Sequence, residues 1–376
     1  MKDKQINKDE EILDTTDDQE IQPDIGALSE VYPTAVNVTK DDSSVFELKR
    51  QYDRKRIELS PSYQRESVWS KKQKSELIES ILMGIPLPIM YFFQDNQGIK
   101  QVVDGKQRLT TLFDFLDNRF SLSELTVMPE LKGKKFDDLD GLYQGKIEDY
   151  KLSINVIKPP TPDRIKFDIF DRVNRGGTRL NNQEMRNAIY QGEATKLLDR
   201  LKDNEDFKNA TDNSVRSKVM KDRYMILRFI AFYLWKEKLL TTKNGEFIDY
   251  KSDIDSFLGK TMEFLNFTSS EMIMDIENIF KKAMSNSYNI LGSNGFRVST
   301  YYNESYKRPV NMALFEVLSY LMTKIDLEDK EVLLDKITRL INEDEFYESI
   351  TTPVDSAVKV NKRFDYIDKL IMEIQQ

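Results

Sequence analysis

Short apolar runs separated by turn residues fill the chain up to about residue 160. Their alternation predicts strands at residues 36–38, 57–59, 89–93, 99–103 and 152–156. Helical spacing predicts one helix after Asp41-Asp42-Ser43, which offers N-caps, and another over residues 71–83 after a Ser70 cap. Residues 122–150 are expected to be rich in loops. This part of the chain therefore predicts a compact α+β unit.

The hydrophobic period changes after residue 160. From residue 162 to 375 apolar residues recur almost wholly at helical spacing, and we find no internal repeat of fixed length. The predicted helices cover residues 162–173, 182–191, 194–203, 219–238, 252–266, 269–288, 309–325, 328–342 and 355–374. The predicted fold class is therefore α+β, with a small mixed α/β domain at 45–160 followed by a larger all-helical domain at 161–376.

Charge is unevenly distributed along the chain. Residues 1–44 contain 12 acidic and 4 basic residues and so account for the whole net charge of -8, which leaves 52 of each kind in the remainder. This acidic segment lacks apolar periodicity before about Ile25, so we interpret it as a disordered tail rather than a domain. A regulatory arm that competes with nucleic acid for a basic groove is the alternative interpretation.

The chain contains no cysteine and no histidine. These absences exclude disulfides, thiolate metal sites, Ser-His-Asp triads, HNH-type nuclease sites and histidine-ligated zinc. Any chemistry must therefore use carboxylates, Lys, Arg, hydroxyls or a metal ion held by oxygen. No apolar run has the length of a membrane span, and acidic residues follow Met1 where a signal peptide would be apolar, so we expect a cytoplasmic protein.

Residues 102–112 are the most informative stretch, because an apolar strand runs into a glycine turn that opens a helix. Lys106 and Arg108 fall in the first turn of this helix, where backbone N–H groups and the helix dipole favour an anion such as phosphate. Asp104, at the end of the strand, suits a metal ion or a hydroxyl group. The alternative is an ordinary strand–turn–helix connection whose charges are solvated.

A second polar cluster lies at residues 167–187. Asn181 and Glu184 have the spacing of a capping box, so local structure accounts for both. Four residues lack such an explanation: Asn174, Arg175, Arg179 and Arg186. Their density around one turn is compatible with an anion site and with a solvated helix hairpin. Further basic sets, each ordinary by itself, occur at residues 216–223, 297, 307–308 and 359–363.

Motifs in a fixed order carry a family resemblance. They are Tyr63-Gln64-Arg65 with Trp69, Glu79-Ser80-Ile81, the turn 84–88, Asp104-Gly105-Lys106-Gln107-Arg108-Leu109, Phe170-Asp171-Arg172-Val173-Asn174, Gly176-Gly177, Leu180, Glu184-Met185-Arg186-Asn187, Arg223, Arg228-Phe229, Phe296-Arg297, Arg308-Pro309-Val310-Asn311 and Phe315-Glu316. In this order and spacing, residues 45–370 resemble GmrSD-type restriction proteins, whose N-terminal domain shares the ParB/sulfiredoxin-like fold. Lys106 is a departure, because the family pattern usually reads Asp-Gly-Gln-Gln-Arg.

The resemblance implies nucleotide binding and hydrolysis at residues 104–108, within bacterial defence against phage or modified foreign DNA. Lys106 preserves the turn and adds a cation, so phosphate binding is still expected, while the preferred nucleotide is left open. Many relatives carry a second, histidine-dependent HNH nuclease domain, which this histidine-free chain does not contain. DNA cleavage by this chain alone would need a carboxylate–Mg²⁺ site.

The first functional hypothesis is an NTP-binding protein that hydrolyses NTP with Mg²⁺. Asp104 and Arg108 are the expected catalytic residues, and Asp104 is also the expected metal ligand. The residues expected to bind nucleotide are Gln64, Arg65, Gly105, Lys106, Gln107, Asn174, Arg175, Arg179 and Arg186. Nucleotide would then lie between the two domains and control their closure.

Two other hypotheses remain open. One is a non-catalytic DNA-binding or sensor subunit that uses the same cations on DNA phosphates and acts with a separate effector nuclease or other defence subunit. The other is a purely structural interaction protein, in which Asp104 and Arg108 would be replaceable. Assembly into a homo-oligomer is compatible with each hypothesis, and none involves a membrane.

Overall fold

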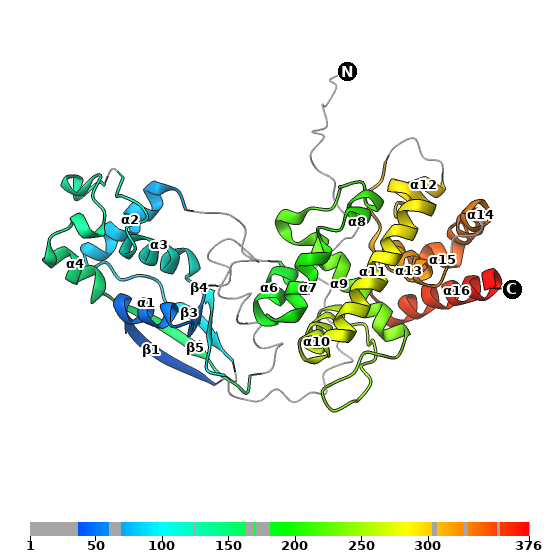
Figure 1. The fold of residues 1–376 in the computed structure, drawn as a ribbon, viewed down its shortest axis with the longest axis horizontal. Helices are drawn as coiled ribbons and strands as arrows, with labels where there is room; N and C mark the ends of the chain where they lie inside the picture. The colour runs from blue at the N-terminus through cyan, green and yellow to red at the C-terminus, as the bar shows by residue number, and fades with distance from the viewer. Residues whose placement is uncertain are drawn as a thin grey trace, which may run out of the picture. The chain divides into compact units, whose positions relative to one another are not determined.

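The computed structural model describes residues 37–59, 69–95, 97–123, 125–161, 169, 181–302, 307–325, 330–351 and 354–375. The chain divides into two compact units, and the division falls between Ile189 and Tyr190. We call the unit before this point the mixed unit and the unit after it the helical unit (Figure 1). The mixed unit includes residues beyond 160, and the domain bounds 45–160 and 161–376 stay a prediction.

A five-stranded sheet in the order β1-β5-β3-β4-β2 forms the centre of the mixed unit. The strands are β1 (Val38–Ser44), β2 (Ile57–Glu58), β3 (Met90–Gln94), β4 (Lys100–Asp104) and β5 (Lys151–Ile157). β1 is antiparallel to β5 and β3 is antiparallel to β4, whereas β3 is parallel to β5 and β2 is parallel to β4. The strands predicted at 57–59, 89–93, 99–103 and 152–156 are present, whereas the one predicted at 36–38 shares only Val38 with β1. The mixed sheet confirms the α+β prediction.

Helices pack with this sheet around one buried apolar cluster, in which Phe92 and Leu109 are fully buried. The helices of the mixed unit are α1 (Val45–Asp53), α2 (Lys71–Leu82), α3 (Lys106–Leu116), α4 (Gly141–Glu148) and α6 (Asn182–Ile189). Short 3-10 segments occupy Pro129–Leu131 and Phe136–Asp138. The predicted Ser70 cap is confirmed, because its side chain and that of Gln73 form a reciprocal capping box.

One local prediction in the mixed unit is wrong, and another is incomplete. Asp41-Asp42-Ser43 lies in β1, because the pairing with β5 continues to Ser44, and Ser44 is the residue that caps α1. The segment 122–150, predicted to be rich in loops, also contains α4. The apolar pattern of α4 is weak, since Ile147 is its one buried residue and the helix contains two glycines.

The helical unit consists of helices from α7 to α16. They are α7 (Glu193–Leu201), α8 (Glu205–Ala210), α9 (Lys221–Lys236), α10 (Ile254–Phe267), α11 (Ser270–Leu291), α12 (Val298–Tyr301), α13 (Met312–Thr323), α14 (Lys330–Ile341), α15 (Asp344–Ser349) and α16 (Ala357–Gln375), with 3-10 segments at Ser217–Val219 and Gly292–Asn294. Every helix predicted from residue 182 onward is present, whereas the prediction at 162–173 lies outside the described residues except Ile169. Among the described helices, none combines the length and the apolar character needed to cross a membrane.

Four charged side chains inside the helical unit form a buried ionic network. Arg228 of α9 contacts Glu316 of α13, and its Nη2 lies 2.5 Å from Oδ1 of Asp355. Arg363 of α16 contacts the same Glu316, with Nη2 2.6 Å from Oε2. Arg228, Arg363 and Glu316 are at most 1% exposed. The network therefore links three helices and balances two cations with two carboxylates.

Candidate functional site

The turn between β4 and α3 brings Asp104 and the predicted anion-binding residues together. Asp104 ends β4, Gly105 adopts a φ of 102°, and Lys106 is the first residue of α3. This positive φ is open to glycine at little cost. A Cβ atom at Gly105 would also lie 2.7 Å from Cγ and Sδ of Met90, a fully buried residue. Both conformation and space therefore demand glycine at this turn.

Arg108 joins the turn to a more distant part of the mixed unit. Its Nη2 donates a hydrogen bond to Oδ2 of Asp104 at 2.6 Å, and its Nη1 donates to the carbonyl oxygen of Pro88. Arg108 is only 8% exposed, whereas the Asp104 side chain is 35% exposed. The guanidinium group thus fastens the end of β4 and the start of α3 to the segment before β3. Sequence reasoning missed the contact with Pro88.

Burial disfavours the charged forms of both cations of the turn. It lowers the pKa of Lys106. Burial also lowers the pKa of Arg108, and the charge and hydrogen bond of Asp104 reverse this effect only in part. The first turn of α3 contains no acidic residue, and Gly105 provides no side-chain cap. A helix start with these properties favours an additional anion.

Gln107 contacts Trp69, the first described residue after the segment 60–68. Its Oε1 accepts a long hydrogen bond of 3.5 Å from the backbone N–H of Trp69. Since β2 runs parallel to β4, the C-terminal end of β2 points in the same direction as the C-terminal end of β4, where Asp104 lies. Both described ends of the segment 60–68 therefore lie on the side of the turn. The predicted residues Gln64, Arg65, Asn174, Arg175 and Arg179 lie outside the described residues.

Arg186 occupies a different environment from the turn. It lies in α6 and is fully buried, and its Nε donates to Oε1 of Gln183 at 3.0 Å. Gln183 in turn donates to Asn187 at 2.9 Å, so these side chains form a buried polar row. The predicted capping box is confirmed, because Asn181 and Glu184 exchange hydrogen bonds of 2.8 and 3.0 Å. A fully buried Arg186 reaches a ligand only if that ligand is itself enclosed.

The candidate metal ligand at this turn is a single carboxylate. Among the residues that the structure describes, no three acidic side chains gather in a metal-binding arrangement. Mg²⁺ in nucleotide sites commonly takes one or two protein carboxylates and completes its shell with phosphate oxygens and water. Asp104, with a partly exposed carboxylate beside a candidate phosphate site, fits such an ion if it arrives with a triphosphate.

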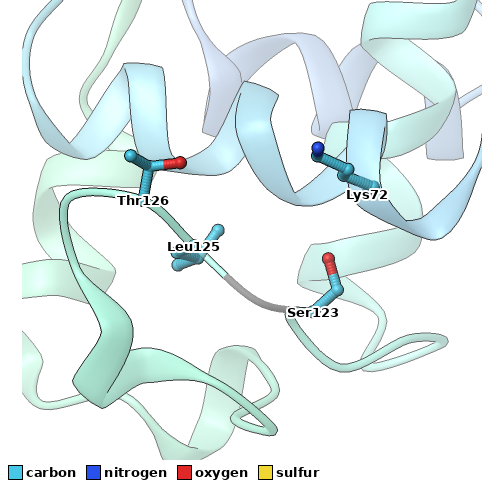
Figure 2. Close-up of a pocket in the computed structure, with 4 residues that line it drawn as sticks. All are labelled: Lys72, Ser123, Leu125 and Thr126. Carbon is cyan, nitrogen blue, oxygen red and sulfur yellow. The ribbon is translucent and has the colours of Figure 1, made fainter.

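Two open pockets lie along α2. One, of about 360 Å³, is lined by Lys72 of α2 together with Ser123, Leu125 and Thr126, which lie in the segment after α3 (Figure 2). The other, of about 270 Å³, is lined by Trp69, Gln73, Glu76, Leu77 and Ser80. The second pocket adjoins the turn through the contact between Trp69 and Gln107. Of the predicted site residues that the structure describes, none lines either pocket.

Most of the mixed unit matches a known protein family. The family model described as "GmrSD restriction endonuclease, N-terminal domain" matches residues 45–191. The match begins at the first residue of α1 and ends just after α6, so it includes the turn at 104–108. No curated protein matches the chain. The resemblance of the helical unit to GmrSD-type proteins stays a prediction.

Proposed function

Since residues 45–191 belong to the GmrSD N-terminal domain family, we propose that this chain acts in a bacterial restriction-type defence system and binds and hydrolyses NTP with Mg²⁺. The observation that carries the proposal is the turn at 104–108. A strand ends in a carboxylate, a left-handed glycine follows, and a helix begins with two partly desolvated cations. Helix starts of this kind are effective phosphate sites.

The roles of the residues follow from their positions on the turn. The start of α3 and the Lys106 side chain bind the phosphate groups, and Arg108 neutralises charge that develops during hydrolysis. Asp104 holds Mg²⁺ or orients the attacking water. Gln64 and Arg65 complete the pocket, a role supported by the two described ends of their segment, Leu59 and Trp69, which lie on this side of the sheet. Asn174, Arg175, Arg179 and Arg186 are further proposed nucleotide contacts.

Phosphate release from each of the four NTPs with Mg²⁺, with and without DNA, tests this function. We expect Asp104→Asn and Arg108→Gln each to lower turnover by roughly 100-fold or more, because both act on the transition state. Lys106→Gln leaves the Asp104–Arg108 ion pair intact, and we expect it to weaken NTP binding by about ten-fold, the typical effect of losing one charge-assisted hydrogen bond. Thermal melts of each variant check that it is folded.

Lys72→Gln is the matched control, because Lys72 also lies in the first turn of a helix of the mixed unit. It should bind and hydrolyse NTP like the wild type. If Lys72→Gln loses NTP binding and Lys106→Gln keeps it, the nucleotide binds in the pocket of Figure 2 and the proposed site is wrong. Equal turnover in wild type and the Asp104 and Arg108 variants would also contradict the proposal.

A second candidate function is a non-catalytic DNA-binding or sensor subunit that works with a separate effector nuclease. The engagement of Arg108 with Asp104 and Pro88 gives this arginine a structural role that needs no catalysis, so the turn can take this form in a protein that does not hydrolyse NTP. Salt dependence distinguishes the two functions. DNA affinity should fall steeply with added salt, with a slope near -0.9 per neutralised phosphate, whereas NTP affinity should respond less.

A further inference from the structure

Four exposed cations gather where α1 ends and β2 begins. We call them the α1 cation cluster, which consists of Arg50 in the last turn of α1, Arg54 at its C-cap, and Lys55 and Arg56 just before β2. Within the described part of the chain, no carboxylate forms an ion pair with any of the four. The acid among them, Asp53, is already paired, since its Oδ1 lies 2.6 Å from Nζ of Lys49.

The dipole of α1 accounts for only a small part of this charge. The C-terminal end of a helix carries about half a negative elementary charge, which stabilises cations in the last turn. Four cations at this helix end therefore leave a surplus of about three positive charges on the surface. Such a surplus favours an anionic partner.

An exposed aromatic ring adds an apolar part to the same surface. Phe46 is 57% exposed and precedes Arg50 by four residues in α1. Residues four apart lie on one face of a helix, so the ring and the guanidinium group are neighbours on the outer face of α1. A partner that fits this face combines negative charge with apolar side chains.

The N-terminal segment of the chain has this composition. Residues 1–36 lie outside the described residues, and their run 9–20 contains seven acidic residues and no basic one. The same run contains Ile12 and Leu13, which are apolar. We call residues 9–20 the acidic run. Its charge and its apolar residues are both complementary to the outer face of α1.

The register of the sheet places the start of β1 at the same end of the sheet as the cluster. The row of paired residues at this end, from β1 to β2, is Val38, Ile157, Phe93-Gln94, Lys100 and Ile57. Neighbouring strands are about 4.8 Å apart, so four spacings put the first and last residues of the row roughly 19 Å apart along the sheet. Glu20 precedes Val38 by 18 residues, a length that spans up to about 59 Å when extended. The acidic run can therefore reach the cluster.

We propose that the acidic run binds the α1 cation cluster and Phe46 of the same chain and so covers this surface. The covalent connection makes the contact intramolecular, with an effective concentration in the millimolar range, so that weak exposed ion pairs are sufficient. The cluster lies at the opposite end of β4 from Asp104, because Ile57 pairs with the first residue of β4 and Asp104 is the last. The proposal therefore does not depend on NTP binding at the turn.

Fluorescence resonance energy transfer within the full chain tests this contact. The chain contains no cysteine, so Thr16→Cys in the acidic run and Glu47→Cys on exposed α1 provide two labelling sites. We expect a population with close labels at low salt that is lost toward 1 M salt, where the Debye length is about 3 Å. Arg54→Gln/Arg56→Gln should shift the equilibrium away from this population by at least about five-fold, the upper contribution of one exposed ion pair.

Lys132→Gln/Lys135→Gln is the matched control, because it removes the same two charges from exposed residues of the mixed unit outside α1. It should leave the close population unchanged. Arg54→Glu/Arg56→Glu should abolish that population, and the further change Asp17→Lys/Asp18→Lys should restore part of it. A purely structural role of the two arginines predicts no such rescue. Thermal melts check that each variant is folded.

Three outcomes would overturn the proposal. Energy transfer could be equal in the unmodified background and the Arg54 and Arg56 variants, or it could fall as far in the Lys132 and Lys135 control. Transfer that disappears on dilution would show that the acidic run of a second copy occupies the surface, because an intramolecular contact does not depend on protein concentration.

Discussion

Two buried arginines, Arg228 in the helical unit and Arg108 in the mixed unit, have pKa values shifted in opposite directions. In the helical unit, burial lowers the pKa of Arg228, but the charges of Asp355 and Glu316 outweigh this effect and leave its pKa well above the ordinary value. In the mixed unit, Asp104 does not outweigh the burial of Arg108, whose pKa stays lowered. The carboxylates of the network therefore outweigh the burial of Arg228, whereas Asp104 offsets the burial of Arg108 only in part.

Replacing Glu316 by alanine should have the largest effect on stability of the substitutions considered. Arg228 and Arg363 would both lose a carboxylate partner inside the helical unit. We expect the free energy of unfolding to fall by about 3–5 kcal/mol, the usual cost of removing one partner from a buried ion pair. Urea denaturation measures it, with the exposed Glu331→Ala in α14 as the control. A decrease no larger than that of the control would show that the network is not structural.

Gly105→Ala should have the next largest effect. The positive φ alone costs about 1 kcal/mol or more for a non-glycine residue, and the displacement of Met90 by the new methyl group adds roughly 1–3 kcal/mol. Gly133→Ala is the matched control, because Gly133 also has a positive φ, of 84°, but open space where a Cβ would stand. Urea denaturation of the two variants should differ by the contribution of Met90. Equal destabilisation would mean that Met90 yields without cost.

The ionic network should also make stability depend on pH, with a smaller effect than either substitution. Burial raises the pKa of Asp355, but the charge and hydrogen bonds of Arg228, with the charge of Arg363, leave it below the ordinary 3.8. A lowered native pKa stabilises the fold above the unfolded value and loses this contribution as pH falls through the native pKa. Below about pH 4, stability should therefore fall with an added slope of at most about 1.4 kcal/mol per pH unit.

Urea denaturation of wild type and Asp355→Asn across this acidic range measures that slope. The variant lacks the titrating group, so its stability should depend less on pH below about pH 4. Identical pH slopes in the two proteins would assign the acid sensitivity to other carboxylates.

Features set by neighbouring residues were predictable from the sequence. The glycine turn before α3, the Ser70 capping box and the reciprocal bonds of Asn181 and Glu184 each involve residues within a few positions of one another. Short helices escaped prediction, because α8, α12 and α15 have four to six residues and cannot display a helical period. Pairing of β1 with β5 overrode a plausible helix cap at Asp41-Asp42-Ser43.

Contacts between distant residues were not predictable. Arg108 and Pro88 are 20 residues apart, and Arg228 and Glu316 are 88 residues apart, so no local spacing signals either contact. The same holds for the basic sets of the helical unit, which look ordinary one by one. Two of them are brought together because the buried Arg297 donates to Ser214 and to the carbonyl oxygen of Arg308.

The hydrogen bond from Arg108 to Pro88 has a mechanical consequence. Pro88 lies in the segment between the end of α2 at Leu82 and the start of β3 at Met90. A ligand that drew the guanidinium group toward itself would break this hydrogen bond and release the segment that joins α2 to β3 from the start of α3.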